Sequence, residues 1–259
     1  VWGTAQDDVW AVGMGGMTLH YDGTGWTSVD SGLTDSLADV WGLAPGDVWA
    51  AGARGVLLHW DGAAWTRETS GSPEWLRSFW GFPGGDVWVV GDHGTILRRT
   101  GGAWAPETSG VAEWLYAIWG TSPSDLWAAG DGGVIIHLDG SAWTLSPTPT
   151  EEALHAVWGF SATDVWAVGE HGMALHRTAS GWEIVPTGTV EGLDGLWGAA
   201  ADDLYAVGSN GTVIHWDGRE WARAVGDRTE WLSAVWGSSA DEVWVVGNVG
   251  TLLRRTPTP

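Results

Sequence analysis

The sequence of 259 residues contains no cysteine, no lysine and no long hydrophobic run. Without cysteine, the chain has no disulfide bond, no thiolate nucleophile and no cysteine-ligated zinc. Its apolar runs are far shorter than the roughly 18 residues that cross a bilayer, so we expect no membrane insertion. All 11 basic residues are arginines, set against 32 acidic residues, and the formal net charge is −21. Such an acidic surface repels phosphate backbones, so we expect no nucleic-acid partner.

Phenylalanine and tyrosine are scarce, at three each, whereas the chain has 24 tryptophans and 41 glycines. Glycine-rich turns between runs of tryptophan, valine, isoleucine and leucine favour many short strands. The dipeptide Trp-Gly recurs every 39 residues without an insertion, beginning at Trp2, Trp41, Trp80, Trp119, Trp158, Trp197 and Trp236. A strict period of this length is typical of the blades of a β-propeller.

One repeat unit reads as four strands. In the stretch that starts at Trp75, "WLRSFWG" alternates, "VWVVG" follows a turn, "TILRRT" follows a hairpin with the tip "DH", and "GGAW" turns into a fourth strand. This pattern predicts an all-β fold, a seven-bladed β-propeller that forms a single domain over residues 1–259. The expected repeat units, one per blade, are 1–39, 40–78, 79–117, 118–156, 157–195, 196–234 and 235–259.

The two ends of the repeat array are incomplete. The chain begins with Val rather than Met, in the middle of a first strand, and the last blade lacks its fourth strand. We expect either a segment trimmed from a longer protein or a seventh blade with an open outer edge. In the second case, charge and proline in the final "RRTPTP" would discourage pairing along that edge.

The repeated phrase VWG-x4-D-[VL]-W-A-[VA]-G-x2-G-x-[LI]-[LI]-H-x-D-G-x2-W covers the whole chain. It resembles a Trp-rich propeller repeat of secreted or surface-exposed bacterial proteins. It is more loosely similar to tectonin-type lectins, whose Trp-rich repeats also build propellers. The resemblance implies a propeller fold, an extracellular or cell-surface location and a lectin-like function as expectations.

Three tryptophan positions recur in nearly every unit, which favours packing between blades over ligand binding. The first is the Trp of Trp-Gly. The second comprises Trp10, Trp49, Trp88, Trp127, Trp166 and Trp244, with Tyr205 in their place in the sixth unit. The third comprises Trp26, Trp65, Trp104, Trp143, Trp182 and Trp221.

Two polar positions also recur. An acid opens the second strand at Asp8, Asp47, Asp86, Asp125, Asp164, Asp203 and Glu242, and a donor stands in the third strand at His20, His59, Arg98, His137, His176, His215 and Arg254. A two-residue hairpin tip would place position 8 opposite position 21, and Asp8 diagonally beside His20. Because Arg replaces His in two units, we interpret these pairs as structural links rather than as metal or catalytic histidines.

Candidate binding residues lie where the units differ, on the loops that join one blade to the next. An acid precedes the first strand at Asp35, Glu74, Glu113, Glu152, Glu191 and Glu230, and in three units a tryptophan follows it, at Trp75, Trp114 and Trp231. Two residues further on, the side chain varies most, as Ala38, Arg77, Tyr116, His155, Asp194 and Ser233. One hypothesis is a set of Trp–carboxylate pockets in which sugar rings stack. The alternatives are that the acids cap loop N–H groups while the rings cover blade seams, or that the carboxylates hold Ca²⁺.

Signals for an enzyme are weak. The turn "DGTGW" departs from the Asp-box of sialidase propellers, and a ring of near-identical carboxylates offers no privileged catalytic pair. The sequence therefore predicts a non-enzymatic module without cofactor or metal that recognises glycans in a lectin-like manner, or alternatively a protein-interaction scaffold. The predicted ligand-binding residues are Glu74, Trp75, Arg77, Glu113, Trp114, Tyr116, His155, Glu230 and Trp231.

Overall fold

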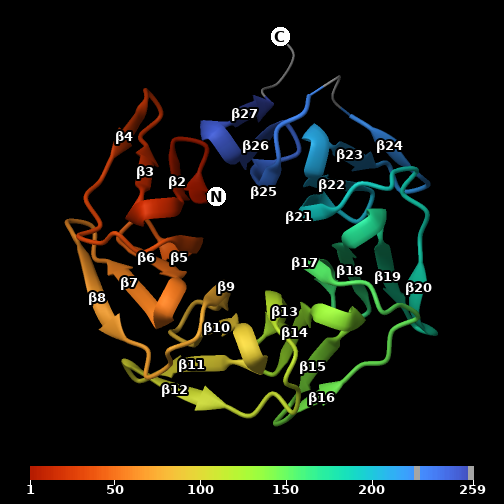
Figure 1. The fold of residues 1–259 in the computed structure, drawn as a ribbon, viewed down its shortest axis with the longest axis horizontal. Coiled ribbons are helices and arrows are strands. Elements are labelled where there is room, and N and C mark those ends of the chain that lie inside the picture. Colours follow the sequence, from red (N-terminus) through yellow and green to blue (C-terminus); the bar gives the residue numbers. More distant parts are fainter. Residues whose placement is uncertain (225–227, 256–259) are drawn as a thin grey trace.

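The computed structural model describes residues 1–224 and 228–255. These residues form seven antiparallel sheets arranged in a ring around a central channel, as Figure 1 shows. Six sheets have four strands in sequential order and the seventh, β25-β26-β27, has three. The predicted seven-bladed propeller is confirmed. The last four residues of "RRTPTP" lie outside the described residues, and with them the predicted protection of the open edge.

Each blade begins at the channel and ends at the rim. The innermost strands are β1 (Trp2–Ala5), β5 (Leu37–Ala44), β9 (Leu76–Gly81), β13 (Leu115–Ser122), β17 (Leu154–Ser161), β21 (Leu193–Ala200) and β25 (Leu232–Ser239). The second strands are β2 (Asp8–Val12), β6 (Asp47–Gly52), β10 (Val87–Gly91), β14 (Asp125–Gly130), β18 (Asp164–Gly169), β22 (Asp203–Gly208) and β26 (Glu242–Gly247). The third strands are β3 (Thr18–Tyr21), β7 (Val56–Trp60), β11 (Ile96–Thr100), β15 (Ile135–Asp139), β19 (Ala174–Thr178), β23 (Val213–Trp216) and β27 (Leu252–Arg255). The outer strands are β4 (Trp26–Ser28), β8 (Trp65–Thr69), β12 (Ala103–Glu107), β16 (Trp143–Leu145), β20 (Gly181–Ile184) and β24 (Trp221–Arg223).

The hairpin between the second and third strands has a three-residue tip that forms a short 3₁₀ turn. These tips are η1 (Met14–Gly16), η2 (Ala53–Gly55), η3 (Asp92–Gly94), η4 (Asp131–Gly133), η5 (Glu170–Gly172), η6 (Ser209–Gly211) and η7 (Asn248–Gly250). Because the tip has three residues and not two, the strand register differs by one residue from the prediction. Val9, rather than Asp8, lies opposite Tyr21. The predicted register was therefore wrong, although Asp8 and His20 remain diagonal neighbours on one face.

The predicted acid–base links are confirmed in all seven blades. His137 Nε2 lies 2.6 Å from Asp125 Oδ1, and the Arg98 guanidinium donates to Asp86 at 2.9 Å. The other five pairs are His20–Asp8, His59–Asp47, His176–Asp164, His215–Asp203 and Arg254–Glu242. Each donor also lies over the aromatic ring of the second strand, as where the His137 and Trp127 ring centroids are 3.7 Å apart. A polar link inside each blade is thus shielded by a buried ring.

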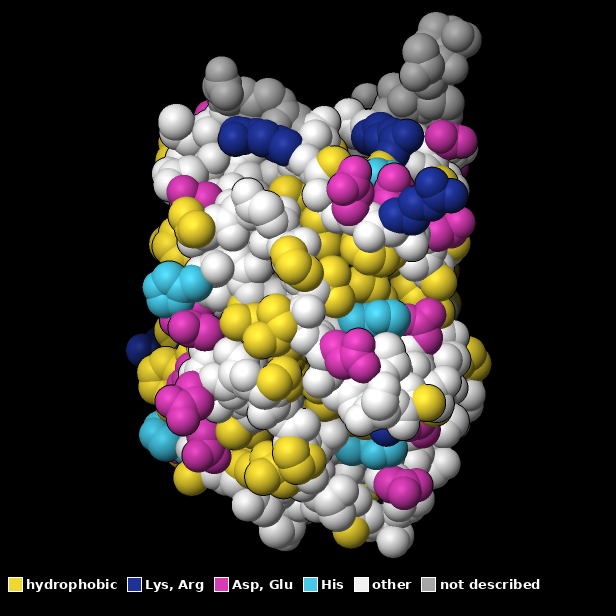
Figure 2. Space-filling view, turned by 90° about the vertical axis from the view of Figure 1, so that its right-hand side faces the viewer, with side chains coloured by type: hydrophobic (Ala, Val, Ile, Leu, Met, Phe, Trp, Pro, Cys, Tyr) yellow, Lys and Arg dark blue, Asp and Glu magenta, His cyan; other side chains and the backbone are white. Residues whose placement is uncertain are grey.

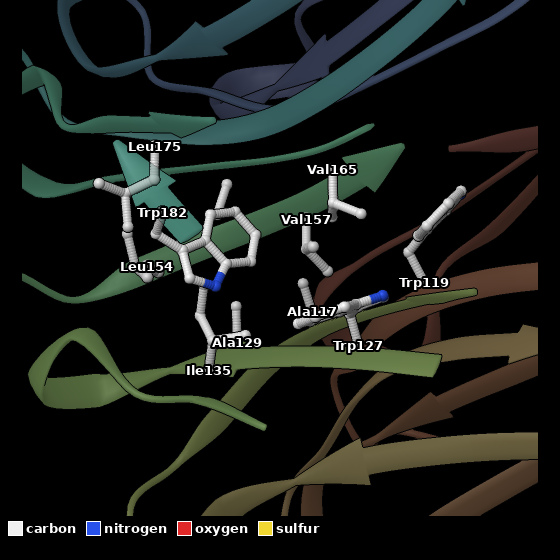
Figure 3. Close-up of a cluster of buried hydrophobic side chains, with 11 residues drawn as sticks. Ala117, Trp119, Trp127, Ala129, Ile135, Leu154, Val157, Val165, Leu175 and Trp182 are labelled. Atoms are coloured by element: carbon white, nitrogen blue, oxygen red, sulfur yellow. The ribbon is translucent and has the colours of Figure 1, made fainter. Parts of the chain in front are cut away.

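Tryptophans also form the seams between blades, as predicted. The outer-strand ring of one blade packs edge-on against the second-strand ring of the preceding blade, for example Trp182 on Trp127 at 5.7 Å. Figure 3 shows this seam, where Trp182 from β20 meets a buried cluster that includes Leu154 and Val157 from β17. The same contact between Trp26 and Trp244, at 5.5 Å, joins blade 1 to blade 7.

The tryptophan of each Trp-Gly pair packs against the glycine of the next blade at five seams, those of Trp2, Trp41, Trp119, Trp197 and Trp236. Trp80 and Trp158, from non-adjacent blades, differ in that their rings meet edge-to-face at 5.9 Å across the channel. Trp80 still contacts the next blade, since its indole N–H donates to the Gly120 carbonyl oxygen at 2.9 Å. Both tryptophans are followed by Gly-Phe in the sequence. Phe160 takes the vacated place at Gly198, where an added Cβ would lie 2.7 Å from the phenylalanine ring. The two inward tryptophans narrow the channel.

Candidate functional site

The channel mouth on the hairpin-tip face is the candidate site. A cavity of about 570 Å³ runs along the channel and is lined at the mouth by Arg77, Tyr116, His155, Asp194 and Trp231. The inner strands position these side chains, because each strand begins at the mouth and its second residue points into the channel. The tryptophans of the Trp-Gly pairs line the deeper part. The site is a concave, largely aromatic pocket with a few polar groups at its opening.

Arg77, on β9, is held among three aromatic rings. The centre of its guanidinium lies 5.4 Å from the ring centroid of Trp75, 5.1 Å from that of Trp114 and 5.0 Å from that of Tyr116. Its Nε donates to Asp92, the first residue of the η3 tip. The cation–π contacts and the ion pair fix the guanidinium in one place.

A second set of contacts continues around the mouth. The Tyr116 hydroxyl donates to Asp131 at 2.7 Å, and the Tyr116 ring meets the His155 ring edge-on at 5.1 Å. Burial and the adjacent Asp131 carboxylate raise the pKa of Tyr116, so its hydroxyl stays protonated and remains a donor. His155 Nδ1 lies 3.1 Å from Asp194 Oδ1, and the Trp231 indole N–H donates to Asp194 Oδ2 at 2.8 Å.

We call Trp75, Arg77, Trp114, Tyr116, His155, Asp194 and Trp231 the mouth cluster. The structure thus brings six of the nine predicted site residues into one connected set. Asp194 completes it, although it was only one of the variable positions in the sequence. Three exposed tryptophans belong to it, with exposed fractions of 38% for Trp75, 38% for Trp114 and 53% for Trp231.

The predicted acids do not enter the cavity. In four blades the carboxylate before the first strand bonds to the middle residue of its own hairpin tip, 19 residues later in the chain. The four pairs are Asp35 with Arg54, Glu74 with His93, Glu152 with His171 and Glu191 with Asn210. These four acids therefore bind side chains of the tips, rather than the loop N–H groups that one of the sequence-based alternatives predicts as their partners.

Glu113 and Glu230 differ from the other four acids. The middle tip residues opposite them are Gly132 and Val249, which offer no polar side chain. Among the described residues, their carboxylates instead accept backbone N–H bonds from Ala112 at 3.0 Å and from Thr229 at 3.2 Å. These two bonds are the loop caps that the sequence analysis had considered.

Other chemistry at this face is limited within the described part of the chain. One trio, Glu152, Glu170 and His171, places three possible metal ligands within 4.8 Å of one another. The trio is largely exposed, and its His171 nitrogen already bonds to Glu152 at 2.8 Å. Hydrogen bonding to Glu152 raises the pKa of His171. No helix within residues 1–224 and 228–255 is long and apolar enough to cross a membrane.

Known proteins resemble this chain in fold and not in sequence. No protein-family model matches the sequence, and no curated protein is similar to it. Among solved structures, YCF48 bound to a D1 peptide is 18% identical, with a TM-score of 0.80 over 99% of this chain and 92% of that chain. The WD40 propeller of Doa1 is 14% identical, with a TM-score of 0.78 over 96% and 89%. Virginiamycin B lyase from Staphylococcus aureus is 14% identical, with a TM-score of 0.75 over 98% and 97%.

These similarities show a shared β-propeller fold. At such low identity they carry no function across, because propellers host unrelated activities. One of the three similar structures is named as a lyase and another is bound to a peptide. The function of this chain must therefore be argued from its own channel mouth.

Proposed function

We propose that this chain is a non-enzymatic protein-interaction module that binds a segment of a partner protein at the channel mouth. The observation that carries the proposal is the composition of the mouth cluster. Tryptophan, tyrosine and arginine are the residues that dominate binding energy at protein interfaces, and here they surround a pocket of about 570 Å³.

The mouth cluster is held in place before any partner arrives. Asp92 bonds to Arg77, Asp131 accepts from Tyr116, and Asp194 accepts from Trp231. Rings and guanidinium groups that are already fixed lose less conformational entropy on binding, which favours affinity. A propeller of the same overall shape, YCF48, has been solved with a D1 peptide bound, which supports a peptide as the kind of ligand for such a fold.

Glycan binding, the first of the two predicted functions, has less support. A sugar ring needs the open face of an aromatic ring. The Arg77 guanidinium already lies 5.4 Å from the Trp75 centroid and 5.1 Å from the Trp114 centroid. The indole N–H of Trp231 is also engaged by Asp194.

Selection from a random peptide library tests the proposal. We expect peptides that bind the wild-type protein and bind at least tenfold more weakly to a Trp114→Ala/Trp231→Ala variant. The matched control is Leu145→Ala/Ile184→Ala, which removes two exposed apolar side chains from outer strands, 60% and 52% exposed. The proposal fails if no peptide is selected, or if the control variant weakens binding as much as the mouth variant. Saturable binding on a glycan array that is lost in the mouth variant would favour the lectin hypothesis.

A further inference from the structure

At the channel mouth, the basic side chains have acidic partners, whereas two of the acidic side chains have no basic partner in an ion pair within residues 1–224 and 228–255. Both basic groups of the mouth cluster already have acidic partners, Arg77 with Asp92 and His155 with Asp194. At the same face, Glu113 and Glu230 bond only to backbone N–H groups of their own loops among the described residues. Backbone hydrogen bonds chiefly lower the pKa of Glu230, with a smaller contribution from the charge of nearby Arg228, so its carboxylate is charged at neutral pH.

The other blades supply an internal comparison. In four blades the middle tip residue bonds to the carboxylate that precedes the first strand of the same blade. These tip residues are Arg54, His93, His171 and Asn210. In blades 4 and 7 the corresponding place is filled by Gly132 and Val249. The carboxylate before the first strand thus has a side-chain donor at the middle of its hairpin tip in four blades and none there in the other two.

These two carboxylates, which accept only backbone hydrogen bonds among the described residues, stand beside exposed rings. Trp114 follows Glu113 directly, and Trp231 follows Glu230. An arginine or lysine side chain from a partner can lay its aliphatic stem or its cation against an indole ring while its charged end meets a carboxylate. Each Glu-Trp pair therefore offers the two contacts that such a side chain uses. At Trp114 the Arg77 guanidinium already lies 5.1 Å from the ring centroid, so the partner side chain would contact the part of the indole that stays exposed, 38% of Trp114.

The two Glu-Trp pairs lie on opposite sides of the channel. They precede β13 and β25, which face each other across the channel in Figure 1. A segment that contacts both pairs crosses the channel mouth above the cavity. The chain carries a formal net charge of −21, and Figure 2 shows acidic side chains over much of the side of the molecule that faces the viewer. Long-range attraction therefore also favours a cationic partner.

We infer that the partner segment is basic, and that two of its arginine or lysine side chains bind Glu113–Trp114 and Glu230–Trp231 from opposite sides of the channel mouth. This inference rests on the proposed function, because it names the chemistry of the segment that the mouth binds.

The test compares two isosteric double variants that change the net charge equally. Glu113→Gln/Glu230→Gln alters the two acids that accept only backbone hydrogen bonds among the described residues, and Glu152→Gln/Glu191→Gln alters two acids that have partners on their tips. The probes are fluorescein-labelled peptides from the library selection, and a glycine–serine peptide that carries two arginines. Binding is measured by fluorescence anisotropy, and thermal melting of each variant verifies folding.

We expect the selected peptides to be enriched in arginine and lysine. Their affinity should fall by roughly tenfold in Glu113→Gln/Glu230→Gln and by less than about twofold in Glu152→Gln/Glu191→Gln, and it should weaken as salt rises. Equal losses in both variants would mean non-specific attraction to an acidic protein and would overturn the inference. Selected peptides that lack basic residues yet lose binding in the tryptophan variant would also overturn it, while leaving the proposed function intact.

Discussion

The indole of Trp41 in blade 2 covers Gly81 in blade 3, so closely that a Cβ on Gly81 would lie 2.6 Å from the indole Cη2 atom. The same relationship joins Trp119 to Gly159 and Trp197 to Gly237. The ring is closed in this way too, because Trp236 covers Gly3. The two residues of the repeated dipeptide therefore serve different seams, since the tryptophan contacts the blade ahead while the glycine accepts the ring from the blade behind.

We expect Gly81→Ala to destabilise the fold by about 1–3 kcal/mol, because the added methyl group overlaps both the ring and a backbone oxygen. The backbone at Gly81 has no positive φ, so the effect comes from packing alone. Gly46→Ala is the control, since its nearest atoms would lie 3.6 Å away. Chemical denaturation measures both variants, and equal midpoints would show that the Trp-Gly contact is not close.

In the hydrogen bond between Asp125 and His137, we expect stability to depend on the presence of a donor at position 137 and not on the imidazole ring in particular. His137→Ala should cost about 1–3 kcal/mol, because it removes one of the two side-chain donors that the partly buried Asp125 carboxylate has among the described residues, the other being Thr121. It also exposes the face of Trp127 that His137 covers. His137→Arg should cost much less, since Arg98 makes the same contacts in blade 3. Thermal unfolding of the two variants measures the difference. If arginine is as damaging as alanine, the link requires histidine specifically.

The turns between the third and outer strands predict how stability depends on pH. Asp22 accepts the Thr24 hydroxyl and two backbone N–H groups, which lower its pKa to about 2. Backbone N–H bonds also lower the pKa values of Asp61 and Asp217. A depressed pKa contributes stability that is present above the usual aspartate pKa and is lost as the pH falls through the folded value.

The melting temperature should therefore fall as the pH drops from about 5 toward 2. The triple variant Asp22→Asn/Asp61→Asn/Asp217→Asn keeps oxygen acceptors in the turns but removes their titration. Its melting temperature should decline less steeply over this range than that of the wild type. Parallel declines would contradict the role given to these three carboxylates.

Val249 predicts a stabilising substitution. It is a β-branched residue with a φ of 55°, at the middle of the η7 tip, and it is 95% exposed. Because a side chain at this left-handed position is strained and buries nothing, Val249→Gly should stabilise the fold by about 0.5–1 kcal/mol. The control, Val190→Gly, changes an exposed valine without a positive φ and should not stabilise. Calorimetry or denaturant titration ranks the two variants.

The 39-residue period and the strand pattern were sufficient to predict the fold, because each unit repeats the same apolar alternation and the same turn residues. The predicted register was wrong by one residue because the tip of the first blade holds three residues, Met14–Gly16, whereas the prediction assumed two. The inward rotation of Trp80 and Trp158 was missed as well. Its sequence signal is the phenylalanine that follows each of these Trp-Gly pairs, at Phe82 and Phe160.

The site was predicted less completely than the fold. Variable positions on the inner strands correctly indicated which side chains gather at the mouth, because repeat geometry places equivalent residues in one ring. The partners of Arg77 and Tyr116, which are Asp92 and Asp131, were not identified because their contacts depend on how each tip folds back. A contact between blades, such as Trp231 with Asp194, leaves no pattern within one unit. A location outside the cell or at its surface stays a prediction.

Hydrogen–deuterium exchange with a saturating selected peptide tests most directly whether the channel mouth is the binding surface. We predict slower exchange in residues 92–94, 111–114 and 228–231, which carry the hairpin tip and the loops of the mouth. Residues 83–86 and 162–163, in turns at the opposite face, should exchange at unchanged rates. Protection confined to that opposite face or to the outer strands, with the mouth unchanged, would contradict the account.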